Sequence, residues 1–253
     1  VHTTLDMETQ DILETEFQKG IDNNQNILRR EFINSPKKLR KALKPTGFNE
    51  DTILHILKNK LPIPRELKNQ FVVQGAAIVM EVKSGKILAL IGGRNEENYR
   101  DHFNRATQAK RQPGSVFKPF IYLTALENGF LPTTQLLNQP LVFFIDDTIR
   151  WNPQNHDGST SLHETLRYGL KKSLNLISVR IVQELVPPKK IRNNAGEFGL
   201  TTYIRAVDAI ALGVSEVIPL EITAAYATIA NNGVYNVPQV IDKIEDRYGR
   251  VLK

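Results

Sequence analysis

The chain is expected to enter a helix within the ten residues RQPGSVFKPF at positions 111–120. Gly114 permits a tight turn of the backbone, and Pro119 lacks an N–H group, which a helix tolerates mainly in its first turn. These two residues place Ser115 at the N-terminus of a helix that we expect to end near Asn128.

Ser115 and Lys118 are three positions apart, so their side chains share one face of that helix. A serine hydroxyl becomes an effective nucleophile only when a base removes its proton. Lysine can be that base when burial and nearby positive charge, including the helix dipole, lower its pKa. The exposed N–H of Ser115 would also help to stabilise an oxyanion. The pair therefore predicts a serine nucleophile activated by a lysine.

A simpler interpretation is that Ser115 only caps a helix, as serines at this position usually do. The pattern Ser-x-x-Lys is common by chance, and the chain has a second copy at positions 35–38. That copy contains a proline and lies in a polar, basic run, so we assign it no role. The tetrapeptide alone favours the cap, and a nucleophile needs support from elsewhere in the sequence.

A second motif, Ser-Leu-Asn at positions 173–175, lies at the break between two predicted helices. From such a break Ser173 can relay a proton between Lys118 and a leaving amine. Asn175 can hold the lysine or a substrate amide. Because Ser-x-Asn tripeptides arise often, the alternative for this motif is a solvated helix cap.

The rest of the pattern mixes strands with helices. Two β-rich runs at 76–82 and 86–91 predict a hairpin, and their apolar faces favour central strands covered by helices. Residues 20–70 are polar and Asn-rich with a basic cluster at 29–44, and we interpret them as an insertion. The other expected elements are helices at 7–19 (capped by Asp6), 50–60 (capped by Asn49), 162–170 (capped by Ser161), 174–185 and 219–230, and a strand–turn–strand start at 239–252.

Composition limits the function classes only loosely. The chain has 253 residues with 41% hydrophobic and 24% charged side chains, which suits one large globular domain or two small ones. Its net charge of +6 suits a polyanion such as nucleic acid, anionic lipid or an anionic cell wall. The absence of cysteine excludes disulfides and thiolate metal sites. Because the sequence starts at Val1 without an apolar leader, we expect it to be part of a longer protein.

The order of the two motifs resembles that of the acyl-serine penicillin-recognising enzymes, in which Ser-x-x-Lys precedes Ser-x-Asn. The flanking sequence narrows the resemblance to class A penicillin-binding proteins. It covers most of residues 71–253 and the first few residues, with Lys171 and Lys172 departing from the small residues often found there. The stretches that carry it are 3–6, 75–93, 103–120, 151–155 and 211–233.

This resemblance implies an α/β (α+β) transpeptidase fold like that of penicillin-binding proteins and β-lactamases. Such a fold has a mainly antiparallel sheet flanked by helices, together with an all-helical part. We expect residues 1–70 to start the transpeptidase region, with a basic insertion at 20–70, and 71–253 to form the N-terminal portion of the domain. The family's third motif, Lys-Thr/Ser-Gly, is absent, since Lys-Pro-Thr-Gly at 44–47 is interrupted by proline. We expect it beyond residue 253.

The resemblance also implies a mechanism and partners. Ser115 would attack a peptidoglycan stem peptide, Lys118 would take its proton, and Ser173 and Asn175 would assist. An amine of a neighbouring stem would then resolve the acyl-enzyme, and penicillin would acylate the same serine. No metal or organic cofactor is implied. The implied setting is the bacterial cell envelope, outside the cytoplasm, with a membrane anchor and a glycosyltransferase domain. Without its third motif the chain alone is expected to be poorly active or inactive.

Two other functions compete with this one. A serine β-lactamase relative would share both motifs but would need a deacylating glutamate, and Glu164 and Glu221 are more simply surface or structural residues. A non-enzymatic wall- or nucleic-acid-binding module would use the basic cluster at 29–44. That cluster contains a single aromatic residue, Phe32, and no series of interleaved aromatic residues for stacking on bases, so we expect no nucleic-acid partner.

Overall fold

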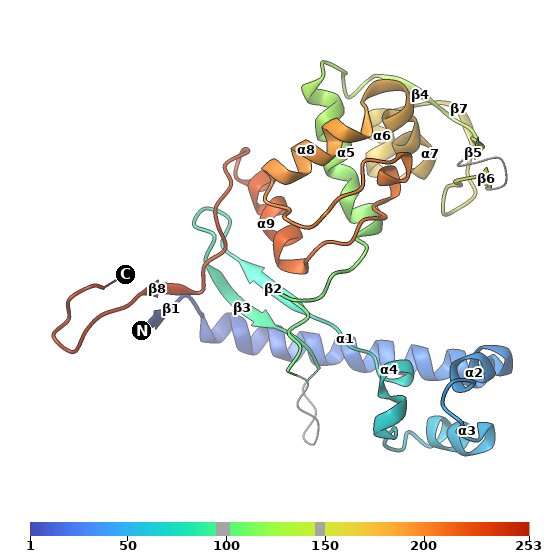
Figure 1. Cartoon of the computed structure of the whole chain (residues 1–253), viewed down its shortest axis with the longest axis vertical. Coiled ribbons are helices and arrows are strands. Elements are labelled where there is room, and N and C mark those ends of the chain that lie inside the picture. Colours follow the sequence, from blue (N-terminus) through green and yellow to red (C-terminus); the bar gives the residue numbers. More distant parts are fainter. Residues whose placement is uncertain (95–101, 145–149, 253) are drawn as a thin grey trace. The chain divides into compact units, whose positions relative to one another are not determined.

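The computed structural model describes residues 1–94, 102–144 and 150–252. The chain divides into two compact units (Figure 1). The first unit comprises Val1–Glu81, Lys86–Gln108 and Pro238–Lys253, and the second comprises Val82–Gly85 and Ala109–Val237. The sequence predicts a different division, into residues 1–70 and 71–253. That division describes where the family domain begins, and it stays a prediction.

One long helix supports the first unit. Its elements are β1 (His2–Thr3), α1 (Met7–Asn34), α2 (Pro36–Leu43), α3 (Glu50–Lys58), the 3-10 turn η1 (Arg65–Leu67), α4 (Lys68–Phe71), β2 (Ala77–Met80), β3 (Ile87–Ile91) and β8 (Ile241–Lys243). Strands β2 and β3 form the predicted antiparallel hairpin, and α1 lies along it (Figure 1). Within the described residues the hairpin is a two-stranded sheet rather than the centre of a larger one.

Two glutamines of α1 form hydrogen bonds with the backbone of the segments that pack against this helix. The side-chain oxygen of Gln10 accepts from Leu90 N at 2.9 Å. The buried amide of Gln25 donates to Phe71 O at 2.8 Å and accepts from Val73 N at 2.9 Å. Each glutamine therefore satisfies backbone groups that would otherwise be left unpaired inside the protein.

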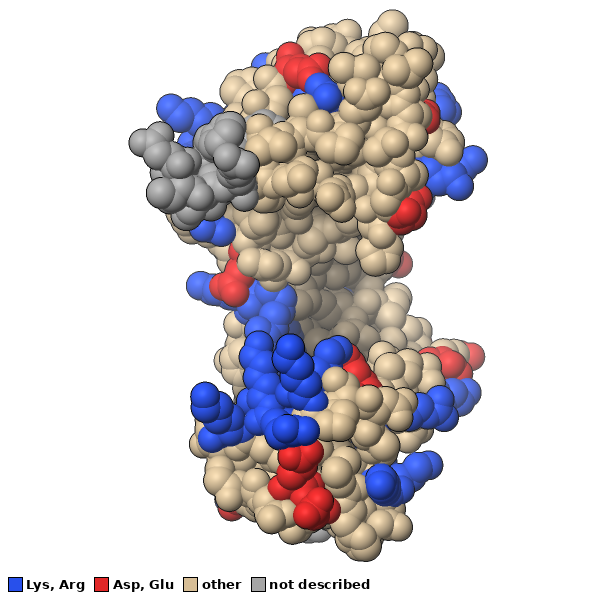
Figure 2. All heavy atoms as spheres, turned by 90° about the vertical axis from the view of Figure 1, so that its right-hand side faces the viewer, with Lys and Arg blue, Asp and Glu red and all other residues tan. Residues whose placement is uncertain are grey.

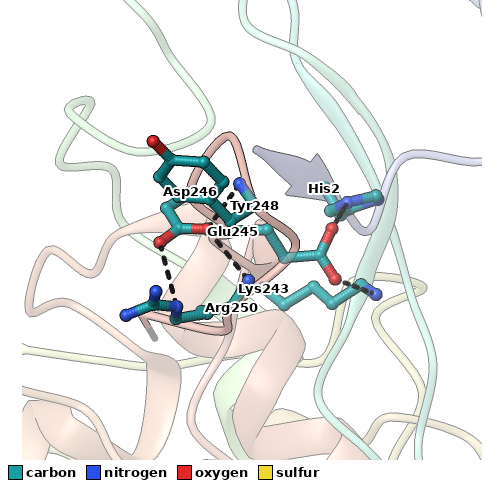
Figure 3. Close-up of polar contacts among 6 residues, drawn as sticks. All are labelled: His2, Lys243, Glu245, Asp246, Tyr248 and Arg250. Carbon is teal, nitrogen blue, oxygen red and sulfur yellow. Dashed lines mark hydrogen bonds and ion pairs between the residues drawn. The ribbon is translucent and has the colours of Figure 1, made fainter.

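The two ends of the described chain meet in the first unit. Strands β1 and β8 pair antiparallel, and the Glu245 carboxylate accepts from both His2 Nε2 and Lys243 Nζ at 2.7 Å (Figure 3). These hydrogen bonds, first from Lys243 and then from His2, lower the pKa of Glu245. A bridge between Glu245 and Val251 closes the strand–turn–strand that the sequence predicts.

The helix predicted at 7–19 is longer than expected and ends at Asn34. Its Asp6 cap is confirmed, since the Asp6 carboxylate accepts from Thr9 N at 2.8 Å. The helix continues through Gly20 because Ile21 and Gln25 are buried on its inner face, which offsets the cost of glycine in a helix. The end at Lys19 is therefore wrong, because polar composition hid the buried face.

Residues 36–71 have a hydrophobic core of their own. Helix α3 begins at the predicted cap, with the Asn49 side chain accepting from Asp51 N at 2.8 Å. Phe71 from α4 packs against Phe32 from α1 with the two rings tilted, their centroids 4.7 Å apart. The buried members of the core are Leu39, Leu43, Ile53, Leu57, Leu67 and Phe71. The polar, basic region is thus an ordered helical subregion.

The second unit is arranged around a buried helix, α5. Its elements are the 3-10 turn η2 (Gly114–Phe117), α5 (Lys118–Glu127), β4 (Gln135–Asn138), β5 (Phe143–Phe144), β6 (Arg150–Trp151), β7 (Ser161–Thr165), α6 (Leu166–Lys171), α7 (Asn175–Arg180), the π-helical turn η3 (Ile181–Leu185), α8 (Pro188–Glu197), the 3-10 turn η4 (Asp208–Leu212) and α9 (Pro219–Ala230). Phe120, Ile121 and Ala125 of α5 are each 0% exposed. Helices α6, α7 and α8 all contact α5 (Figure 1), so the residue that begins α5 is held firmly in place.

The helix predicted at 162–170 with Ser161 as its cap is wrong in its first half. Residues Ser161–Thr165 form β7, which pairs antiparallel with β4, and the helix begins at Leu166 with the Thr165 hydroxyl as its cap. Leu162 is 72% exposed, so the apolar spacing that suggested a helix does not mark a buried face. The helices predicted at 174–185 and 219–230 are confirmed, the first as α7 followed by η3.

Replacement of Gln25 by leucine should lower the free energy of unfolding by about 1–3 kcal/mol, because the buried carbonyl of Phe71 and the half-buried N–H of Val73 lose their partner. Gln18→Leu is the matched control, since Gln18 is an exposed residue of the same helix. Its effect should stay within about 0.5 kcal/mol. Chemical denaturation followed by circular dichroism measures both, and equal losses would contradict the role given to Gln25.

Candidate active site

Ser115 lies in η2, the short 3-10 turn that leads directly into α5. Gly114 has a φ of +56° and makes the tight bend that the sequence predicts, while Pro119 lies in the first turn of α5. Tyr226 from α9 donates to Val116 O at 2.8 Å and fixes the turn from one side. The Ser115 side chain is left exposed at the start of a buried helix.

Two glycines bring backbones close together beneath this turn. Gly114 N donates to Gly213 O at 3.2 Å, and Gly213 has a φ of +62°. A Cβ atom at position 213 would lie only 2.2 Å from the Gly114 carbonyl oxygen. Arg111 and Val217 exchange backbone hydrogen bonds of 3.0 and 2.9 Å nearby. Glycine at position 213 is therefore needed for the turn that carries Ser115.

Lys118 is a buried cation with three oxygen partners from the second motif. Lys118 as a whole is only 1% exposed to solvent. The Nζ atom donates to Ser173 O at 2.5 Å, to Ser173 Oγ at 3.0 Å and to Asn175 Oδ1 at 2.8 Å. Burial disfavours the charged form and lowers the pKa of Lys118 from its usual 10.5 to about 8. A substantial neutral fraction at mildly alkaline pH makes this amine a competent base.

Ser173 occupies a backbone position that favours glycine. Helix α6 ends in a Schellman motif, in which Ser173 N donates to Leu170 O at 3.0 Å and Leu174 N donates to Gly169 O at 2.8 Å. Ser173 stands at the left-handed position of this motif, with a φ of +54°. A residue with a side chain is strained in this conformation. The conformation directs both the hydroxyl and the carbonyl of Ser173 toward Lys118.

Asn175 is oriented by the segment before the second motif. Its Nδ2 donates to Gln154 O at 2.8 Å, which leaves Oδ1 for Lys118. The neighbouring Asn155 is buried, donates to Asn138 Oδ1 at 2.8 Å and accepts from Leu176 N at 3.1 Å. This chain of amides holds the first turn of α7 in position.

Three of the four predicted site residues come together, namely Lys118, Ser173 and Asn175. Ser115 lies three residues before Lys118 on the same turn, but its hydroxyl makes no hydrogen bond within the described residues. Its role as nucleophile stays a prediction. In the described part of the chain, no cluster of His, Asp or Glu side chains is arranged to hold a metal ion.

Comparison with known proteins decides the family. Residues 75–253 match the penicillin-binding protein transpeptidase domain. The chain belongs to this family. The expected transpeptidase fold, with helices and antiparallel strand pairs, is thereby confirmed.

The relatives of this transpeptidase domain include class A enzymes. The chain is 40% identical over 182 residues to penicillin-binding protein 1A of Pseudomonas aeruginosa, covering 71% of this chain and 22% of that protein. It is 38% identical over 182 residues to the protein of the same name from Neisseria flavescens, with the same two coverages. The chain thus spans about 22% of the length of these curated relatives.

Solved structures agree with this assignment. Penicillin-binding protein 1A from Haemophilus influenzae matches with a TM-score of 0.66 and 34% identity, over 73% of this chain and 27% of that one. PonA1 from Mycobacterium tuberculosis matches all of this chain and 56% of its own, with a TM-score of 0.66 and 24% identity, and supports the fold alone.

Sequence reasoning missed two residues that shape this candidate site. Gly213 and Asn155 both lie in stretches that resemble the family, but neither was given a role. The only local signs were a glycine between two apolar residues, at position 213, and an asparagine two residues after a proline, at position 155. The two glutamates considered for a β-lactamase have structural partners, since Glu164 accepts from Ser161 Oγ and Glu221 accepts from Thr201.

Helices of the described residues are all too short or too polar to cross a membrane.

Comparing Ser173→Gly with Ser173→Ala separates backbone strain from the hydroxyl. Both variants lack Oγ, so both should slow acylation by penicillin to a similar extent in the full-length protein. The glycine variant should be more stable than the alanine variant by about 1 kcal/mol, because only alanine is strained at a φ of +54°. Thermal unfolding and acylation rates test this, and equal stabilities would argue against a strained position.

Proposed function

We propose that this domain acts as a serine D,D-transpeptidase that crosslinks peptidoglycan stem peptides. The observation that carries the proposal is the buried Lys118 amine on Ser173 and Asn175, one turn after an exposed serine. Family membership and the names of the relatives support the same activity. The proposed nucleophile is Ser115, the proposed base is Lys118, and Ser173 and Asn175 are proposed to assist.

In the first half-reaction Ser115 Oγ attacks the carbonyl carbon of the penultimate D-alanine. Neutral Lys118 takes the hydroxyl proton, and the N–H of Ser115, at the start of the helical turn, donates to the oxyanion. The amide C–N bond then breaks, and the terminal D-alanine leaves after receiving a proton through the Ser173 hydroxyl. The products are free D-alanine and an ester between the stem peptide and Ser115.

In the second half-reaction an amine of a neighbouring stem peptide attacks this ester. The amine loses a proton to the Lys118–Ser173 pair, an amide bond forms, and the Ser115 hydroxyl is regenerated. The reaction exchanges one amide for another and needs no external energy source. A β-lactam ring offers the same kind of carbonyl, and its opening leaves a slowly hydrolysed ester on Ser115.

The proposed setting is the outer side of a bacterial cytoplasmic membrane. The relatives named penicillin-binding protein 1A support a cell-envelope location. We propose that the whole protein carries a glycosyltransferase domain and a membrane anchor, and that its binding partners are stem peptides and β-lactams.

The nucleophile can be tested by incubating the full-length protein with benzylpenicillin and measuring its intact mass. The wild-type protein should gain one penicillin adduct, whereas Ser115→Ala should gain none, because Ser115 is the proposed nucleophile. Ser35→Ala is the matched control, since Ser35 belongs to the other Ser-x-x-Lys sequence. Adduct on Ser115→Ala, or its loss from Ser35→Ala, would reject the assignment.

The pH dependence of acylation tests the base. With a Lys118 pKa of about 8, the neutral amine should rise from about one-tenth of the population at pH 7 to about nine-tenths at pH 9. The acylation rate constant should therefore rise about tenfold over this range and then level off. Stopped-flow measurement, corrected for spontaneous penicillin hydrolysis, gives the profile. A rate that keeps rising past pH 10 would show that burial does not lower the pKa.

A further inference from the structure

Helix α2 presents a row of positive charge that the transpeptidase mechanism does not use. Its inner face is apolar, with Leu39 at 0% and Leu43 at 5% exposure in the core of the helical subregion. Lys37 and Lys41, four residues apart, lie on one exposed side, and Lys44 follows one turn further. The apolar side of α2 is thus already covered by this chain, and only its charged side is open to a partner.

These basic side chains line a hollow of ≈ 650 Å³ in the first unit. Its walls are α2, the turn after it and the start of α3, including the partly exposed ring of Phe48. Figure 2 shows Lys and Arg side chains gathered on this side of the first unit. The hollow is open and shallow, but it gathers its charges around one place, which distinguishes it from a charge run spread over a convex surface.

The charge of the hollow is unbalanced. It is lined by four cations and one carboxylate, that of Glu50, so its net charge is three positive. Arg40 Nε lies 3.2 Å from Glu50 Oε2, which orients the guanidinium. The side chains of Lys37, Lys41 and Lys44 form no ion pair or hydrogen bond within the described residues. Like charges on neighbouring helical turns repel one another, and a multivalent anion would relieve that repulsion.

Phosphate suits this arrangement better than other anions. A phosphate monoester carries about 1.5 to 2 negative charges, whereas a single carboxylate carries one. Lysine ammonium groups bind phosphate as point charges, and the guanidinium of Arg40 adds a planar fork of donors. Phe48 is the sole aromatic residue among those that line the hollow, so a row of stacked bases has no platform.

We propose that the hollow formed by α2 and the start of α3 binds a phosphate-bearing anion, supplied either by lipid headgroups or by a soluble phosphate. The site is separate from the Lys118 cluster and has no step in the transpeptidase reaction.

The test compares binding of the protein with a triple variant, Lys37→Gln, Lys41→Gln and Lys44→Gln. Glutamine keeps the helix propensity of lysine and leaves Leu39 and Leu43 untouched, so α2 should remain folded by circular dichroism. Binding to pyrophosphate is measured by calorimetry. Binding to vesicles of phosphatidylglycerol and phosphatidylcholine is measured by sedimentation, with pure phosphatidylcholine as the blank.

The variant should lose pyrophosphate binding, and its partitioning onto anionic vesicles should fall roughly a hundredfold, because each of the three lysines contributes about fivefold. If the wild-type protein binds both anionic vesicles and pyrophosphate, the natural ligand is a lipid headgroup. If it binds pyrophosphate alone, the natural ligand is a soluble phosphate. Ser115→Ala should bind like the wild type, so failure of the proposed nucleophile leaves this result intact.

The charge-matched control replaces Lys83, Lys189 and Lys190, three exposed lysines of the second unit, by glutamine. It should bind like the wild type. Equal losses in both triple variants would mean that net charge alone drives adsorption and would overturn the proposal. Absence of saturable binding to either phosphate probe would also overturn it, as would tighter binding of polyglutamate or single-stranded DNA than of pyrophosphate.

Discussion

The Lys118 amine is buried in the protein, and hydrogen bonds to Ser173 and Asn175 hold it in place. Its contacts with Ser173 and Asn175 join segments 55 and 57 residues apart in the sequence. A buried cation without partners would be severely destabilising, whereas three oxygens at hydrogen-bond distance make the position tolerable. The same burial lowers the pKa of the amine to about 8, which suits the role of base proposed for Lys118.

The supports of this amine are mostly backbone features. Gly213 lets its segment approach the Gly114 backbone more closely than any residue with a side chain would allow, and Gly114 adopts the positive φ of the turn. Ser173 accepts a φ of +54° at the end of α6, where glycine would be the more stable choice. Backbone strain of this kind is found mainly at functional sites, and here the strained serine contacts a buried lysine through its hydroxyl.

Local sequence patterns predict the turns and helix starts of this chain better than its long-range contacts. The turn at Gly114, the cap at Asp6 and the helix α9 can each be predicted from the sequence, because each depends on residues that are neighbours along the chain. The extension of α1 to Asn34 depends on Ile21 and Gln25 finding partners far along the chain, which no local pattern reveals. Likewise β7 replaces a helix because β4 lies beside it. The close approach at Gly213 is a tertiary contact, so its role could be found only in the structure.

The three contacts of Lys118 differ in what they can do when the lysine changes charge. A protonated amine has three N–H donors and the site offers three acceptors, so the charged state is fully satisfied. A neutral amine has two N–H donors and one lone pair, so one contact must be given up or reversed. The carbonyl of Ser173 and the amide oxygen of Asn175 can only accept, and only the Ser173 hydroxyl can turn and donate to the lone pair. Ser173 is therefore the one partner through which a proton can pass in both directions, which supports its proposed place between Lys118 and the leaving amine.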